Sequence, residues 1–177
     1  PKTGVEFRGG KGNLYEGGLR IPMAVRWPGK IKPGRVSDHL WYFPDVMPTF
    51  AELTGAKAAK DTDGISIVPE LIGAKTAGRE QKKHKYLYWE LGRQTAVRMK
   101  DWKAIRPRPG ADWELYDLKK DISEAHNVAG ENSKILTQMK AFASEAHVDA
   151  VEGTFADTAN HQKDRAAKYG STRPPKR

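Results

Sequence analysis

The residues best suited to chemistry lie in a glycine-rich stretch near the start of the chain. Lys11 stands between Gly10 and Gly12, and a second glycine pair, Gly17 and Gly18, follows shortly after. Glycine permits positive φ angles and lets the backbone approach a ligand closely. A lysine ammonium is a compact charge with three donors, which suits a tetrahedral anion. The spacing is not that of a P-loop, and the alternative interpretation is a glycine-rich turn with a solvent-exposed lysine.

A histidine and an acidic run are two further candidates for chemistry, and the sequence supports them less than it supports Lys11. His39 is able to do acid–base chemistry, but it stands without a visible partner in the sequence, as structural histidines do. The Asp61–Gly64 run is similar to the start of a calcium loop, but Ile72 stands where an EF-hand needs its Glu. The remaining histidines lack metal-ligand spacing. We therefore predict no metal site within this sequence.

Composition limits the possible partners of the chain. The formal net charge of +9 is compatible with nucleic acid, with sulfated polysaccharide, or with basic residues scattered over solvated faces. The densest basic clusters, residues 82–85 and 171–177, lack the interleaved aromatic residues of a nucleic-acid stacking platform. No apolar stretch is long enough for a membrane span. Cysteine is absent, so disulfides and thiolate chemistry are excluded. The sequence begins without Met, and we interpret Pro1 as a cut point.

The elements that must position Lys11 are predicted in two groups. Residues 20–27 form a short apolar run that ends at Pro28 and Gly29, which predicts a buried strand. A helix is expected to begin after Asp45 as N-cap and to end at Gly55. Its predicted apolar face consists of Val46, Phe50 and Leu53.

The second group predicts a small antiparallel sheet with a helical cover. Strands are expected at residues 86–91, 94–99, 102–106 and 113–118, with a two-residue hairpin loop at Lys100 and Asp101. A helix capped by Asn132 or Ser133 carries one apolar stripe. We expect residues 1–73 to form one domain, 74–85 a linker, 86–152 the sheet with its helix, and 153–177 an extended or disordered tail.

Several motifs of the chain resemble those of the sulfatase family, in the same order. The segment FRGGKGNLYEGGLRIPMAVRWPGKI at residues 7–31 resembles a family motif in which a lysine lies in a Gly-Gly-Lys-Gly run followed by a strand. Residues 37–55 and 63–73 are similar to the next segments. AVRMKDWKAIR and WELYDLKKDISEAHNVA resemble the hairpin and the Leu-Tyr-Asp-Leu strand of the C-terminal subdomain. The resemblance runs from about Phe7 to His147 and is strongest to arylsulfatase and N-acetylgalactosamine-6-sulfatase-like members.

The resemblance implies a fold, a reaction and a compartment. The fold is α/β of the alkaline phosphatase superfamily, and this chain would hold the end of the large domain plus an α+β subdomain of four antiparallel strands and a helix. Such enzymes hydrolyse sulfate esters with a formylglycine nucleophile and a calcium ion. The substrate would be a sulfated small molecule or glycan. The resemblance also implies a periplasmic or secreted protein.

The resemblance assigns roles to three residues of this sequence. Lys11 takes the place of the family's sulfate-binding lysine, as a catalytic and substrate-binding residue. Arg93 and Gln94 lie in a loop that is similar to one reaching toward the substrate pocket, and the alternative is an ordinary exposed hairpin loop. The Cys- or Ser-x-Pro-x-Arg motif of the nucleophile is absent here, as is the family's Asp-Asn metal pair. We therefore expect this piece alone to be inactive and to bind no calcium.

Two alternatives to a sulfatase remain open at this point. One is a non-catalytic module that binds sulfated glycans through the glycine-rich loop and basic faces. The other is a phosphate-transferring relative of the same superfamily. We expect neither nucleic acid nor membrane as a partner. The predicted strand and helix in residues 20–53 need apolar cover, which would come from an N-terminal part of the protein or from another copy.

Overall fold

The computed structural model describes residues 4, 6–149, 166–167 and 170 of the chain. It divides into two compact units, Pro1–Glu145 and Ala146–Arg177. The first unit contains a four-stranded antiparallel sheet together with helices, which confirms the predicted α+β class. The tail predicted at residues 153–177 lies almost wholly outside the described residues.

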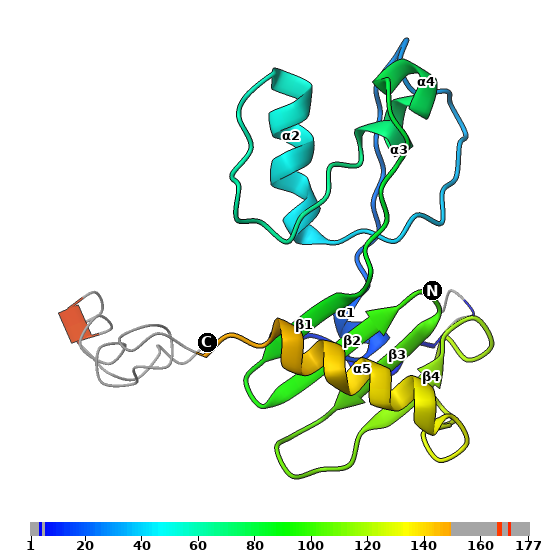
Figure 1. Ribbon diagram of the computed structural model, residues 1–177, viewed down its shortest axis with the longest axis vertical. Helices are drawn as coiled ribbons and strands as arrows, with labels where there is room; N and C mark the ends of the chain where they lie inside the picture. The colour runs from blue at the N-terminus through cyan, green and yellow to red at the C-terminus, as the bar shows by residue number, and fades with distance from the viewer. Residues whose placement is uncertain (1–3, 5, 150–165, 168–169, 171–177) are drawn as a thin grey trace. The chain divides into compact units, whose positions relative to one another are not determined.

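The sheet is a meander in which each strand pairs with the next one along the chain (Figure 1). Its strands are β1 (Leu87–Leu91), β2 (Gln94–Met99), β3 (Trp102–Arg106) and β4 (Glu114–Asp117). These bounds confirm the four predicted strands. The pairs Leu91–Gln94 and Met99–Trp102 close two-residue turns. Each turn has a positive φ at its first residue, as tight hairpins require, 59° at Gly92 and 54° at Lys100.

One face of the sheet is covered by the long helix α5 (Ser133–Ala146), as the sequence predicted. In Figure 1 this helix lies across all four strands. The packing follows the period of two in a strand, because alternate side chains point to the same face. This apolar cluster contains Val97, Ala104 and Leu115 from the sheet and Met139, Phe142 and Ala143 from the helix.

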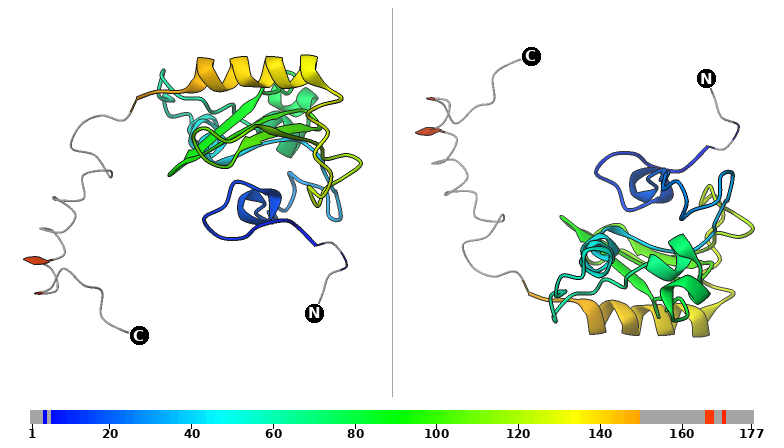
Figure 2. Two further views of the ribbon diagram at one scale, coloured as in Figure 1. Left: turned by 90° about the horizontal axis from the view of Figure 1, so that it is seen from below. Right: turned by 90° about the horizontal axis from the view of Figure 1, so that it is seen from above.

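The opposite face of the sheet is covered by the glycine-rich segment and the short helix α1 (Glu16–Leu19). Figure 2 shows α1 and α5 on opposite sides of the strands. Leu14 and Tyr15 are buried against the other set of alternating strand residues, which are Ala96, Ile105 and Tyr116. Residues near the start of the chain therefore complete the core of a subdomain that begins about 70 residues later.

The remaining helices lie between α1 and β1 in the sequence. They are the 3₁₀ helix η1 (Phe43–Asp45), α2 (Val46–Thr54), α3 (Val68–Ile72) and α4 (Ala74–Ala77). Helix α2 begins after Asp45 and ends at Gly55 with φ of 71°, as predicted, but the Asp45 side chain makes no capping hydrogen bond to this helix. Its predicted apolar face is partly wrong. Phe50 is 62% exposed, whereas Pro48 and Thr49 are buried, so the helix packs on a face rotated from the expected one.

The strand predicted at residues 20–27 is absent from the described structure. This segment is extended but belongs to no sheet, and its apolar side chains Ile21, Met23 and Val25 are exposed. A strand exists only through pairing with a neighbour, and the described residues offer this segment none. The prediction was wrong because apolar composition indicates burial without identifying the partner.

The predicted linker at residues 74–85 contains α4, and the proposed domain boundaries remain predictions. Among the described residues, no helix combines the length and apolar character that crossing a membrane requires.

Candidate functional site

Lys11 occupies the tip of a tight turn formed by residues 10–13. The amide of Asn13 donates to the carbonyl of Gly10 at 3.0 Å. Gly12 has φ of 85°, which places it at the third position of a type II turn, where glycine is preferred. Lys11 is then the second residue of the turn, and it is exposed to solvent. The glycine spacing noted in the sequence therefore builds a turn that presents one ammonium group.

The loop that carries this turn is closed at its base. The amide of Gly17 donates to the carbonyl of Arg8 at 2.8 Å. A side chain at Gly17 would press on the carbonyl oxygens of Arg8 and Gly9, and one at Gly18 would overlap the carbonyl oxygen of Asn13. The second glycine pair is thus required because two stretches of backbone touch there.

A buried ionic network anchors the base of the loop to the sheet. The Lys103 Nζ atom lies 3.0 Å from Oε1 of Glu16 and 2.8 Å from Oε1 of Glu124. The amide of Glu16 also donates to Oε2 of Glu124 at 2.6 Å. The three residues are at most 2% exposed. Lys103 comes from β3, so the loop is tied to the middle of the sheet.

Burial and the charges of this network shift the pKa values of the two carboxyl groups in opposite directions. Burial alone would raise the pKa of Glu16, but Lys103, Arg20 and Arg98 together hold it below its ordinary value. The Arg20 Nε atom lies 2.8 Å from Glu16, and the Arg98 Nη1 atom lies 3.8 Å from it. Burial raises the pKa of Glu124 despite Lys103, because Glu124 has fewer cationic neighbours.

A second polar cluster holds the start of the loop. Arg8 donates to the Tyr116 hydroxyl at 2.6 Å and to the Glu124 carbonyl at 3.2 Å, and its guanidinium lies 4.0 Å from the Tyr15 ring centroid. Glu114 accepts hydrogen bonds from the hydroxyls of Tyr15 at 2.7 Å and Tyr116 at 2.6 Å. Burial and these bonds raise the pKa of both tyrosines, so both hydroxyls stay protonated donors.

The structure brings one of the two predicted turn residues against the Lys11 loop. The Gln94 side chain donates from Nε2 to the carbonyl of Gly12 at 3.0 Å and accepts at Oε1 from the amide of Leu14 at 3.1 Å. Arg93 lies beside it in the turn and is exposed. The amide of Gln94 is therefore engaged by the loop, while its predicted contact with substrate stays untested.

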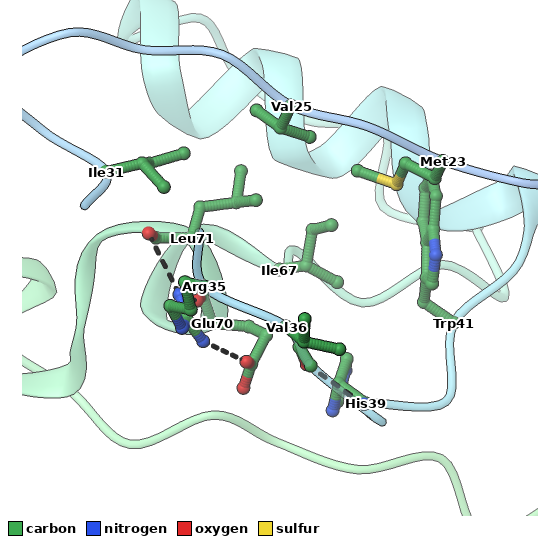
Figure 3. Close-up of a pocket in the computed structure, with 11 residues that line it drawn as sticks. Met23, Val25, Ile31, Arg35, Val36, His39, Trp41, Ile67, Glu70 and Leu71 are labelled. Carbon is green, nitrogen blue, oxygen red and sulfur yellow. Dashed lines mark hydrogen bonds and ion pairs between the residues drawn. The ribbon is translucent and has the colours of Figure 1, made fainter. Parts of the chain in front are cut away.

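His39 lines a pocket of about 300 Å³ on a different group of elements. Figure 3 shows it with Met23, Val25, Trp41 and Ile67, beside the ion pair of Arg35 with Glu70. The pKa of His39 is lowered, because burial disfavours its charged form. The pocket is mostly apolar. His39 is therefore partly buried among mostly apolar side chains.

A histidine with a carboxylate partner lies elsewhere and had no signal in the sequence. His84 Nε2 lies 2.8 Å from Oδ1 of Asp45, and both side chains are buried. Asp45 also accepts from the amides of Tyr42 at 3.0 Å and Ile65 at 2.6 Å. The carboxylate therefore joins two distant segments, at Ile65 and His84, to the start of α2. Its bond network is structural, and the 39-residue separation from His84 hid it from sequence reasoning.

Within the described parts of the chain, no group of three or more His, Asp or Glu residues is placed to hold a metal ion. The candidate for chemistry is the cationic turn at Lys11. It is fixed on a four-stranded sheet by Gln94 near its tip and by the Glu16–Lys103–Glu124 network at its base. The fold and this turn together define an α+β unit that presents one exposed lysine ammonium on a loop bonded to the sheet.

Comparison with known proteins gives the family. Residues 10–148 match the family described as N-sulphoglucosamine sulphohydrolase, C-terminal. The chain belongs to this family and represents the C-terminal portion of a sulfatase.

Individual relatives agree with the family match. The chain is 34% identical over 147 residues to the steryl-sulfatase of Mus musculus, with 81% of this chain and 21% of the relative covered. It is 30% identical to the ulvan-active sulfatase of Formosa agariphila, covering 68% of this chain and 31% of that protein. It is 32% identical to arylsulfatase A of Homo sapiens, covering 76% and 32%. The chain thus spans about a fifth to a third of these relatives.

Solved structures show the same architecture. The crystal structure of Ps i-CgsB superposes with a TM-score of 0.67 at 32% identity, over 78% of this chain and 31% of that one. A structure of BT4656 in complex with its substrate D-glucosamine-2-N,6-O-disulfate has a TM-score of 0.54 at 27% identity, over 68% and 26%. These matches confirm the sheet-and-helix arrangement expected from the resemblance.

Proposed function

We propose that this chain is the C-terminal part of an enzyme that hydrolyses sulfate esters, and that Lys11 binds the sulfate group. The observation that carries the proposal is the Lys11 turn. It presents one exposed ammonium on a backbone that is fixed at two points. The chain's membership of the sulfatase family supports the reaction class.

The chemistry of sulfuryl transfer explains why a fixed cation is useful. As the S–O bond breaks, negative charge spreads over the non-bridging oxygens and accumulates on the leaving oxygen. An ammonium held at those oxygens stabilises the transition state more than the ground state, provided that it is in place beforehand. A fixed turn meets this condition better than a free lysine side chain on a mobile loop, because little reorganisation is needed during the reaction.

The nucleophile and the metal belong, on this proposal, to the rest of the protein. The family resemblance implies a formylglycine and a calcium ion. This sequence lacks the Cys- or Ser-x-Pro-x-Arg motif of the nucleophile, and the described residues hold no group of three or more metal-ligand side chains. The residues present therefore do not fit either group. We expect the chain by itself to hydrolyse no sulfate ester, even with added calcium.

A sulfated sugar or aryl sulfate is the proposed substrate class. One structural relative is described with D-glucosamine-2-N,6-O-disulfate as its substrate, and other relatives are a steryl-sulfatase and an ulvan-active sulfatase. We also expect the protein in the periplasm or outside the cell, as the family resemblance implies. Cell fractionation tests this location, and recovery only from the cytoplasm would contradict it.

The first test compares the complete protein with its Lys11→Ala variant on a chromogenic aryl sulfate. Loss of one preorganised donor should lower kcat by roughly 10²-fold, on the order of 3 kcal/mol of barrier. Thermal stability should stay unchanged, because Lys11 is exposed and at the tip of a turn. Lys134→Ala, at an exposed position of α5, is the matched control.

The outcomes separate the proposal from its main alternative. Unchanged turnover in the Lys11→Ala variant would reject Lys11 as the sulfate ligand. A complete protein that hydrolyses no sulfate ester, but binds sulfated glycans in a Lys11-dependent manner, would indicate a non-catalytic binding module.

A further inference from the structure

We propose that Gln94 is a positioning residue, whose side-chain amide fixes the turn that carries Lys11 and so sets the place of the ammonium relative to sulfate. The proposal rests on the function proposed above for Lys11. Gln94 would then act on the reaction through Lys11. The resemblance had instead implied a direct contact of Gln94 with the substrate.

The turn cannot be stiff by itself. Lys11 is flanked by Gly9, Gly10 and Gly12, and glycine has more backbone freedom to lose than any other residue. Within the turn, the hydrogen bond from Asn13 to Gly10 closes a single ring. An external partner is therefore needed if Lys11 is to occupy one place.

Gln94 supplies two bonds at the point where such a partner would be most effective. It holds the carbonyl of Gly12, directly after Lys11, and the amide of Leu14, two residues further on. One bond needs a donor and the other an acceptor. A primary amide has both on one rigid plane, whereas a carboxylate lacks the donor and a cationic side chain lacks the acceptor.

The support behind Gln94 is itself rigid. Gln94 is the first residue of β2 and pairs with Leu91 across the hairpin. The following residues Thr95 and Ala96 are 4% and 0% exposed. The sheet thus transmits its fixed geometry to the loop through one side chain, across 82 positions of sequence.

The base of the same loop is fixed independently by Lys103, which holds Glu16 and Glu124. With Gln94 intact, the loop is held on the sheet at both ends of residues 12–16. Without it, the base stays in place while the tip is released. The proposal therefore predicts that loss of the Gln94 bonds displaces Lys11, with only a small change in the free energy of unfolding.

Kinetics of the complete protein test this selectivity with two related variants. Gln94→Glu keeps the shape and the acceptor, but removes the donor to Gly12. We expect kcat on an aryl sulfate to fall about tenfold or more, since small displacements of a catalytic group are costly. Gln138→Glu, an exposed glutamine on α5, makes the same change of charge and should have no effect.

A double variant shows whether Gln94 acts through Lys11. In a Lys11→Ala background, Gln94→Glu should lower kcat no further, because there is no ammonium left to position. Equal losses in both backgrounds would overturn the proposal and point to a direct substrate contact or a general structural role.

The two hydrogen bonds of the Gln94 side chain, with Gly12 and Leu14, form a clamp on the loop. Amide hydrogen exchange of the chain tests this clamp without any enzyme activity. In Gln94→Leu, the Leu14 amide loses its acceptor and should exchange roughly tenfold faster. The Leu115 amide, which is bound to Asn127 at 3.0 Å, should keep its protection and report that the sheet is folded. Unchanged exchange at Leu14 would overturn the proposal whatever the kinetics show. Faster exchange in a protein that hydrolyses no sulfate ester would instead retain the clamp and reject the function proposed for Lys11.

Discussion

Lys103 carries one positive charge between two buried carboxylates, Glu16 and Glu124. A buried ion pair contributes little to stability compared with a well-packed apolar contact, because desolvation offsets the attraction. Removing one partner is different, since it leaves the other charge buried without compensation. The cost should be greater here because two carboxylates depend on the same ammonium.

Lys103→Met is therefore expected to destabilise the chain by on the order of 3–5 kcal/mol. Urea unfolding followed by circular dichroism measures the change. Lys119→Met, at an exposed position just after β4, is the control and should stay within about 0.5 kcal/mol of the wild type. A loss below about 1 kcal/mol for Lys103→Met would show that the network relaxes or takes up protons.

His39 provides a prediction about pH. Burial lowers the pKa of its ring in the folded chain relative to the ordinary value of 6.5. A lowered folded-state pKa means that the folded state binds the proton less tightly than the unfolded state. The contribution of His39 to stability is then present above pH about 6.5 and is lost as the pH falls through the folded-state pKa.

Imidazole chemical shifts of His39, followed by NMR against pH, measure this pKa in the folded chain and in urea. The folded value should be the lower one. A His39→Gln variant should lose less stability than the wild type between pH 7 and 5. A folded-state pKa above that of the unfolded chain would contradict the assignment of His39 to an apolar pocket.

At the scale of elements, the glycine-rich loop and α1 depend on close backbone contact. A methyl group at Gly18 would overlap the carbonyl oxygen of Asn13, and no flexible side chain is there to move aside. By contrast, a methyl group at Gly10 would meet no atom within 4 Å, and Gly10 has no positive φ.

Gly18→Ala should accordingly destabilise the chain by about 1–3 kcal/mol or more, as overpacking of backbone does. Gly10→Ala should be neutral or slightly stabilising, because it mainly restricts the unfolded chain. Thermal unfolding of the two variants side by side makes the comparison. Equal effects would indicate that the loop adapts and that its closure is not required for folding.

The elements also show what the sequence was able to predict. Strands β2 and β3 have the predicted bounds, because alternation and a tight turn are local signals. Residues 20–27 were predicted as a strand and form none, since pairing depends on a distant partner. The apolar face of α2 failed in the same way at Phe50. Local patterns identify an element, whereas its neighbours decide which side is buried.

The same distinction between local signals and distant partners applies to the residues of the candidate site. Lys11 was identified from its glycine neighbours, and Gln94 was identified only by resemblance, as a substrate contact. The clamp that Gln94 forms, and the bond of Lys103 to Glu16 across 87 positions, depend on which surfaces meet after folding. Charged residues are common in this sequence, so their pairing has no signal before the sheet is assembled.

At the scale of the whole molecule, the segment after α1 leaves apolar surface uncovered. Ile21, Met23 and Val25 are 67%, 45% and 42% exposed, and they lie on an extended backbone outside any described sheet. Unpaired extended backbone with apolar side chains readily pairs with another chain. This chain corresponds to about a fifth to a third of its relatives, and on the proposed function the remaining part would cover the segment.

The chain by itself should then associate through this segment as its concentration rises. Sedimentation velocity over a range of concentrations measures the association. Replacing Ile21 and Val25 with Thr should weaken it at least about tenfold, because each buried aliphatic side chain contributes on the order of 1.5–3 kcal/mol. Val148→Thr is the control, since Val148 is also exposed, at 81%, but lies beyond α5. Equal weakening by the control would indicate nonspecific association of apolar residues. A chain that stays monomeric at all concentrations would show that residues 20–27 need no partner, and would remove this argument for cover by the rest of a sulfatase.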